Sequence, residues 1–189
     1  MSLVELIAQA DERGLAASGL ACLDRCLPLL GGDDEILRPL WAGLADDADA
    51  GAWGERLEQV RGKLGDAHAS PEEAVLLTRR MLAATPSAPD AAEVRLWADA
   101  CSVAALRIHR LLEGAAPEEA DAASVGARRE GRTEGMSPLV AAELRRQVAV
   151  LELLSEHGVG GLRRVLEVST EGRRVLRAVV SRRARGKLG

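Results

Sequence analysis

The stretch DAAEVRLWADACSVAALRIHRLLE, residues 90–113, decides the fold class of this chain. Its apolar residues recur at steps of three and four, the spacing that places side chains on one face of an α-helix. Asp90 stands at an N-cap position and Glu93 follows at the third helical position, which predicts a helix over residues 91–113. Its buried stripe is expected to contain Val94, Trp97, Cys101, Ala104, Ile108 and Leu111.

Similar start and stop signals divide most of the remaining chain into helices. Ser2 and Glu5 have the spacing of a capping box, and Ser70-Pro71 and Ser137-Pro138 place a cap and a proline at two later helix starts. The pattern predicts helices at about 3–13, 15–30, 35–45, 52–64, 71–85, 91–113 and 138–157, then two short ones at 161–168 and 170–184. The acidic residues 46–49 predict a turn. Pro39 predicts a kink or a late start in the third helix.

Composition also favours an all-α protein. The chain has no Phe, no Tyr and three Trp, so Leu, Ala and Val must build the core. Ala, Leu, Glu and Arg, which dominate the sequence, have high helix propensities, whereas strands favour aromatic and β-branched residues. Apolar residues make up 47% and charged residues 29%, values near the globular average, so the chain can bury a core.

The helix pattern predicts a multi-helix bundle with a C-terminal helical segment. Residues 1–113 should form the bundle. Residues 114–135 contain little that is apolar except Val125, which predicts a polar linker or a poorly packed surface helix. Residues 136–189 form a basic helical segment, which we expect to dock on the bundle or on a second copy of the chain.

Charge is distributed unevenly along the chain. The net charge is −7 for residues 1–70, −3 for residues 71–135 and +6 for residues 136–189. The leading interpretation is that the basic segment packs against acidic helices of its own chain or of a twin chain. An alternative is contact with the phosphates of duplex DNA, and a third is an anionic membrane surface. In the DNA reading, the contacts would come from Arg173, Arg174, Arg177, Arg182, Arg183 and Arg185.

No motif predicts a catalytic residue, a metal site or a cofactor. Cys22 and Cys26 lie one helical turn apart, but a closed structural metal site needs about four ligands, so both are expected in the core. The three His are isolated in the sequence. His109 and His157 stand near helix C-termini, where a cation suits the helix dipole.

These observations favour a non-enzymatic helical interaction or regulatory protein acting on a protein partner or as a homodimer. A DNA-binding regulator is the alternative, and an enzyme or small-ligand binder with an inter-helix pocket is a weaker one. A deep polar pocket with convergent ionisable groups would count against the first reading, and an apolar pocket near Trp97 or Cys101 would support the third. The sequence shows no spanning helix and no signal peptide, so we expect a cytoplasmic protein, and the preference for Arg over Lys suggests a bacterial one.

Overall fold

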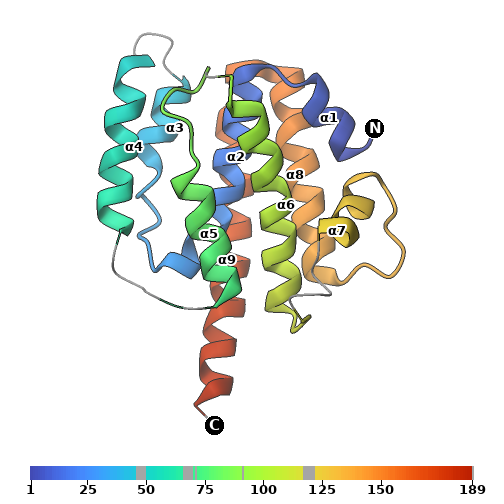
Figure 1. Ribbon diagram of the computed structural model, residues 1–189. Coiled ribbons are helices and arrows are strands. Elements are labelled where there is room, and N and C mark those ends of the chain that lie inside the picture. Colours follow the sequence, from blue (N-terminus) through green and yellow to red (C-terminus); the bar gives the residue numbers. More distant parts are fainter. Residues whose placement is uncertain (46–49, 66–69, 71, 91, 117–121, 189) are drawn as a thin grey trace.

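A computed structural model describes residues 1–45, 50–65, 70, 72–90, 92–116 and 122–188 (Figure 1). All regular structure among them is helical, which confirms the all-α prediction. The helices are α1 (Leu3–Gln9), α2 (Glu12–Cys26), η1 (Leu27–Leu30), α3 (Arg38–Ala45), α4 (Ala50–Leu64), α5 (Glu73–Ala83), α6 (Val94–Leu112), α7 (Ala122–Arg129), α8 (Pro138–His157), η2 (Gly158–Gly161) and α9 (Leu162–Lys187). None of these described helices has the length and apolar character needed to cross a membrane.

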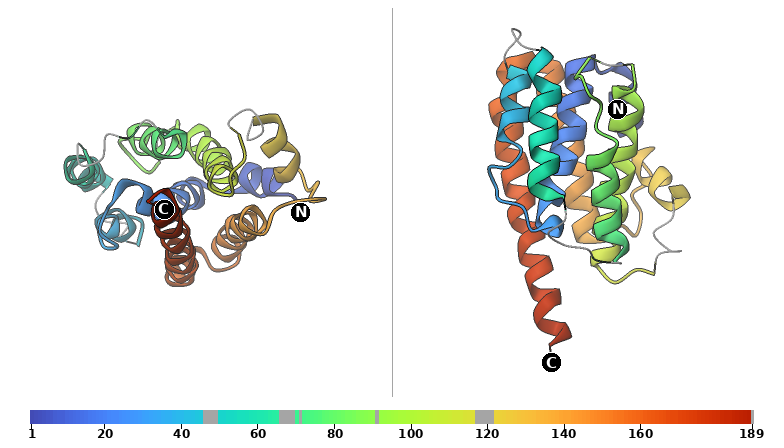
Figure 2. Two further views of the ribbon diagram at one scale, coloured as in Figure 1. Left: turned by 90° about the horizontal axis from the view of Figure 1, so that it is seen from below. Right: turned by 60° about the vertical axis from the view of Figure 1, so that its left-hand side comes forward.

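Helix α2 lies in the middle of the bundle and packs against α6, α8 and α9 (Figure 2). Nearly all of its residues from Gly14 onward are buried. Small residues allow this close packing, because Gly19 lies directly against the ring of Trp97 on α6. The helix predicted in the 90–113 stretch is therefore confirmed. Of its predicted stripe, Val94, Trp97, Cys101 and Ile108 are buried, whereas Ala104 and Leu111 are only partly buried.

Several predicted helix boundaries shift by a few residues. The capping box at Ser2 and Glu5 is present, with the Glu5 amide donating to Ser2 Oγ at 3.3 Å. Helix α3 starts late, with Pro39 in its first turn, as the sequence predicted. Helix α5 begins at Glu73, and α6 begins at Val94 rather than at residue 91. The predicted turn at 46–49 and the positions of Pro71 and Ala91 lie outside the described residues.

The segment expected to be a linker or a loose surface helix contains α7. Val125 is 2% exposed, so this helix has one buried apolar anchor. Arg129 reaches from its last turn to Asp99 and Ser102 on α6. Helix α7 is thus held partly by polar contacts, which is why the spacing of apolar residues in the sequence did not predict its packing.

The C-terminal segment corrects one prediction. Instead of two short helices, a single helix α9 runs from Leu162 to Lys187. Neither Ser169 nor Thr170 is a helix breaker, and the buried face continues from Val165 through Ser169 to Leu176. The last turns of α9 project beyond the end of the bundle (Figures 1 and 2).

Candidate functional site

A buried ion pair between Arg25 on α2 and Glu143 on α8 lies at the centre of the molecule. Both side chains are 0% exposed. Arg25 Nε donates to Glu143 Oε2 at 2.8 Å, and Arg25 Nη2 donates to Oε1 at 2.7 Å. This bidentate geometry satisfies both carboxylate oxygens, which is what allows a buried charge pair to persist.

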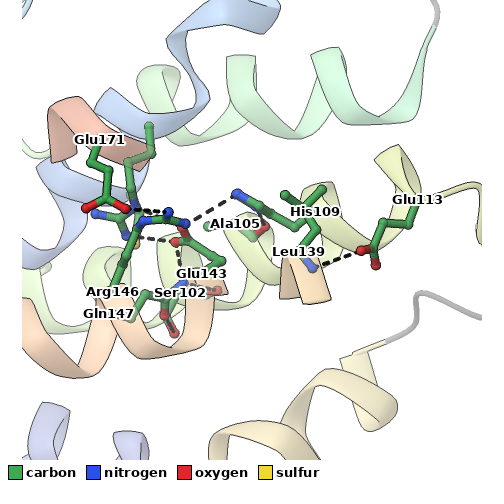
Figure 3. A network of polar contacts seen from close by, with 11 residues as sticks. Ser102, Ala105, His109, Glu113, Leu139, Glu143, Arg146, Gln147 and Glu171 are labelled. Atoms are coloured by element: carbon green, nitrogen blue, oxygen red, sulfur yellow. Dashed lines mark hydrogen bonds and ion pairs between the residues drawn. The ribbon is translucent and has the colours of Figure 1, made fainter. Parts of the chain in front are cut away.

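Further polar contacts extend the pair to α6 and α7. Gln147 Nε2 donates to Glu143 Oε1 at 2.9 Å, and Ser102 Oγ donates to Gln147 Oε1 at 2.6 Å (Figure 3). Arg129 Nε donates to Ser102 Oγ at 3.1 Å. We call these residues, with Arg25 and His109, the Arg25 network. It joins four helices through groups that hydrogen-bond one another.

His109 belongs to this network, and our prediction that it caps the end of its helix is wrong. Its side chain is 1% exposed and faces the interior, because α8 covers that side of α6. Nδ1 lies 2.6 Å from the carbonyl oxygen of Ala105, and Nε2 lies 3.6 Å from Glu143 Oε2. Burial lowers the pKa of His109 although the nearby Glu143 carboxylate acts in the opposite direction. His157, in contrast, is exposed at the end of α8 as predicted.

Opposing effects also act on Glu143. Burial alone would raise the pKa of its carboxyl group. The attraction of Arg25 and His109 and the hydrogen bonds from Arg25 and Gln147 outweigh it, and the pKa falls to about 2. Glu143 is therefore a carboxylate at neutral pH, fixed by its partners and closed off from solvent.

A second ion cluster fastens α9 to the acidic N-terminal part of the chain. Arg173 Nη1 donates to Asp24, which also accepts from the indole of Trp41 at 3.1 Å. Arg177 forms a bidentate contact with Asp34, and Arg173 Nε lies 3.3 Å from the same carboxylate. Burial raises the pKa of Asp24 although Arg173 acts to lower it. Asp24, Asp34 and Arg173 are among the residues that line a depression of about 360 Å³ between α3 and α9.

The six arginines considered for DNA contact divide into two groups. Arg173 and Arg177 are paired with carboxylates as described, and Arg183 donates to the carbonyl oxygens of Leu111 and Leu112 at the end of α6. Arg174, Arg182 and Arg185 are exposed, and no carboxylate in the described part of the chain lies within ion-pair distance of them. Only the second group is free to meet an anionic partner.

An apolar groove with a basic edge lies between α8 and α9, beside the end of α6. We call it the α8–α9 groove. It has a volume of about 560 Å³ and is lined by Leu112, Glu113, Pro138, Leu139, Ala142, Arg146, Val175, Val179, Arg182 and Arg183. Arg146 Nη2 lies 3.3 Å from Glu171, and its Nη1 is buried without a hydrogen-bond partner among the described residues. At the first turn of α8 the Leu139 amide donates to Glu113 Oε1 at 2.9 Å, so one carboxylate also lies at the edge of the groove (Figure 3).

A smaller apolar hollow lies between α5 and α6. This α5–α6 hollow measures about 320 Å³ and is lined by Leu77, Arg80, Met81, Ala84, Trp97, Ala100, Cys101, Val103, Ala104 and Arg107. The small side chains of Ala100 and Ala104 leave the space open. Its position near Trp97 and Cys101 is the one that the sequence analysis associated with a small ligand.

The cysteines are core residues, as predicted for Cys22 and Cys26. All three are free and buried. Burial raises the pKa of Cys22 to about 12, so that thiol is protonated and unreactive at neutral pH. Among the described residues no group of three or more His, Cys, Asp or Glu is placed to hold a metal ion. His68 lies outside the described part.

Sequence reasoning missed the buried charges. Asp24 and Arg25 lie within an otherwise apolar run from Leu20 to Leu30, and that context was the available signal. A charge surrounded by apolar neighbours on all sides of a helix must be buried, and a buried charge requires a partner. The identity of the partners could not be read from the sequence, because Glu143 and Arg173 lie more than a hundred positions away.

The ionisable groups that converge inside the described structure are thus bonded to one another, whereas its main groove is apolar with arginines along the edge. Comparisons of the chain with models of protein families, with curated proteins and with solved structures found no match.

Proposed function

We propose that this protein is a non-enzymatic interaction protein that binds a helical protein partner in the α8–α9 groove. The observation that carries the proposal is the groove itself, in which an apolar bottom formed by Leu139, Ala142, Val175 and Val179 is bordered by Arg146, Arg182 and Arg183. A groove of this type suits an amphipathic helix whose apolar side faces inward and which brings a carboxylate to the bordering arginines.

The buried polar groups support an interaction role rather than catalysis. A general acid or base must reach a substrate, and it needs a pKa near the working pH. Glu143 is 0% exposed and its pKa is about 2, so it meets neither condition. The Arg25 network is better suited to fixing the relative positions of α2, α6, α7 and α8, and hence the shape of the surface that they present.

The proposal predicts binding of a designed peptide that forms an amphipathic helix with Leu along one side and Glu along its flanks. Fluorescence anisotropy should show saturable binding to the wild type and at least a tenfold loss with V179D, which places a charge on the bottom of the groove. V4D is the matched control, because Val4 is 39% exposed on α1, away from the groove. Equal binding by both variants would contradict the proposal.

Duplex DNA is the alternative partner, and fluorescence anisotropy tests this alternative as well. Binding of a random-sequence duplex should be measured at low and moderate salt, with a variant in which Arg174, Arg182 and Arg185 are replaced by Gln. These three are the informative positions, because replacing Arg173 or Arg177 would break ion pairs of the fold. Tight binding that collapses with salt and disappears in this variant would replace the protein-partner proposal with a DNA-binding one.

The α5–α6 hollow supports a second candidate function, the binding of a small apolar molecule. Its lining is apolar apart from the ends of Arg80 and Arg107. Titration with a hydrophobic fluorescent dye should then show one site per chain that is lost in A100F, since a phenyl ring at position 100 fills the space. Ala83 is exposed on α5 and does not line the hollow, so A83F is the control. Loss of the dye site in both variants, or in neither, would count against this function.

A further inference from the structure

We infer that the partner of the α8–α9 groove is a second copy of this chain, bound so that the two α9 helices run antiparallel across a twofold axis near residue 177. The inference rests on the proposed function, because it names the occupant of the same groove. Three features of α9 carry it: its projection, its apolar side and the order of its charges.

The projecting end of α9 has little packing within its own chain. It extends beyond the bundle as a regular helix to Lys187 (Figures 1 and 2). Within the described residues, its last two turns are attached by Arg183 to two carbonyl oxygens of α6 and by Lys187 to Glu72. Helices in proteins owe most of their stability to tertiary packing, so a projecting helix end of this kind is expected to have a partner surface.

One side of α9 carries a stripe of residues, of which Val175, Val179 and Arg182 line the groove. The spacing of an α-helix places residues 168, 171, 175, 179, 182 and 186 on this side. Val168, Val175 and Val179 on it are partly buried, and Gly186 adds no side chain. A twofold axis near residue 177 places Val175 of each chain opposite Val179 of the other, and Val168 opposite Gly186. In this register each valine of the stripe therefore faces a valine or a glycine of the other chain, which gives the self-complementary contact that an isologous interface requires.

The charges on the same stripe are ordered for an antiparallel pair. Glu171 and Arg182 lie at nearly equal distances on either side of residue 177, so each Glu171 meets the Arg182 of the other chain. The Glu171 side chain is 73% exposed and has only a 3.3 Å contact to Arg146, and Arg182 has no carboxylate partner within the described ranges. A parallel pair would instead oppose Arg182 to Arg182, and like charges at an interface are unfavourable.

A charge-swap series measured by sedimentation or light scattering tests the inference. The wild type should have twice the 20.0 kDa mass of the chain. R182E and E171R should each raise the dissociation constant at least tenfold, because each places like charges opposite one another. The double variant E171R/R182E restores opposite charges and should recover most of the affinity. R163E is the control, because Arg163 is 90% exposed at the start of α9 and lies outside the proposed contact.

Circular dichroism must show that each single variant keeps the helical content of the wild type, so that loss of the dimer is not loss of the fold. A dimer that responds equally to R182E and R163E, or whose affinity the double variant does not restore, overturns the antiparallel pairing. A chain that stays monomeric but binds the designed peptide overturns the dimer and leaves the proposed function standing. A monomer that binds no peptide overturns both.

Discussion

Replacing Glu143 with Leu should lower the free energy of unfolding by about 3–5 kcal/mol, the range for removing one partner of a buried ion pair. Arg25 would then be a guanidinium that is 0% exposed and has lost both of its carboxylate bonds. Gln147 and His109 would lose the same partner. Urea unfolding followed by circular dichroism at pH 7 measures the difference.

The control is the double variant R25M/E143L, which removes both charges and keeps a comparable side-chain volume. Replacing a whole buried pair by apolar residues is often close to neutral, so the double variant should be more stable than E143L alone. If E143L lowers the free energy of unfolding by less than about 1 kcal/mol, or if the double variant is the less stable of the two, the pair does not hold α2 and α8 together as we describe.

The ion pair between Arg25 and Glu143 should also affect how the unfolding free energy of the wild type depends on pH. The pKa of Glu143 is about 2 in the folded chain against an ordinary 4.5, so its contribution is fully present above pH 4.5 and is lost as the pH falls toward 2. His109 acts in the same direction at higher pH, because its lowered pKa makes the unfolded chain the better proton acceptor below about 6.5. Asp24, whose pKa is raised, opposes this trend. Between pH 4.5 and pH 2, the unfolding free energy should therefore decrease by less in E143L than in the wild type.

How far the sequence predicts this structure depends on the range of the interactions involved. The helix at 94–112 was predictable because its apolar stripe is local, although it begins three residues later than its N-terminal signals indicated. The continuity of α9 through Ser169 was not predicted, because the continuation of its buried face depends on the contact with α2, which is distant in the sequence. The pairing of Arg25 with Glu143 spans 118 positions, and no local pattern specifies it.

The same distinction applies to the candidate site. The sequence indicated the basic C-terminal segment correctly as a charged region, but composition could not separate Arg173, buried on Asp24, from Arg182, exposed at the groove. Both belong to one helix and differ only in which side they occupy. The basic residues of this segment therefore have two different roles. Some attach α9 to the rest of the chain, and others form a basic border on the α8–α9 groove.

Replacing Gly19 with Ala should destabilise the protein by about 2–3 kcal/mol, although Ala is the better helix former. Helices α2 and α6 pack tightly against each other at this position. A Cβ on residue 19 would lie 2.7 Å from Cε3 of Trp97, closer than non-bonded carbon atoms approach. The ring cannot easily withdraw, because it is 4% exposed and its indole nitrogen donates to the carbonyl oxygen of Met81 at 2.9 Å. Relief of the clash therefore requires α6 to move away from α2 or the hydrogen bond to break.

G62A provides the matched comparison, because Gly62 also lies inside a helix and no atom lies within 4 Å of the Cβ that it would gain. It should stabilise the chain by about 0.5–1 kcal/mol through the conformational entropy of the unfolded state. Urea unfolding of both variants thus separates helix propensity, which acts alike on the two, from packing, which acts on Gly19 alone. If G19A matched G62A in sign and size, the close approach of α2 to α6 would not be a determinant of stability. If G19A is destabilised and its Trp fluorescence changes while that of G62A does not, the contact between Gly19 and Trp97 is what sets the distance between the two central helices.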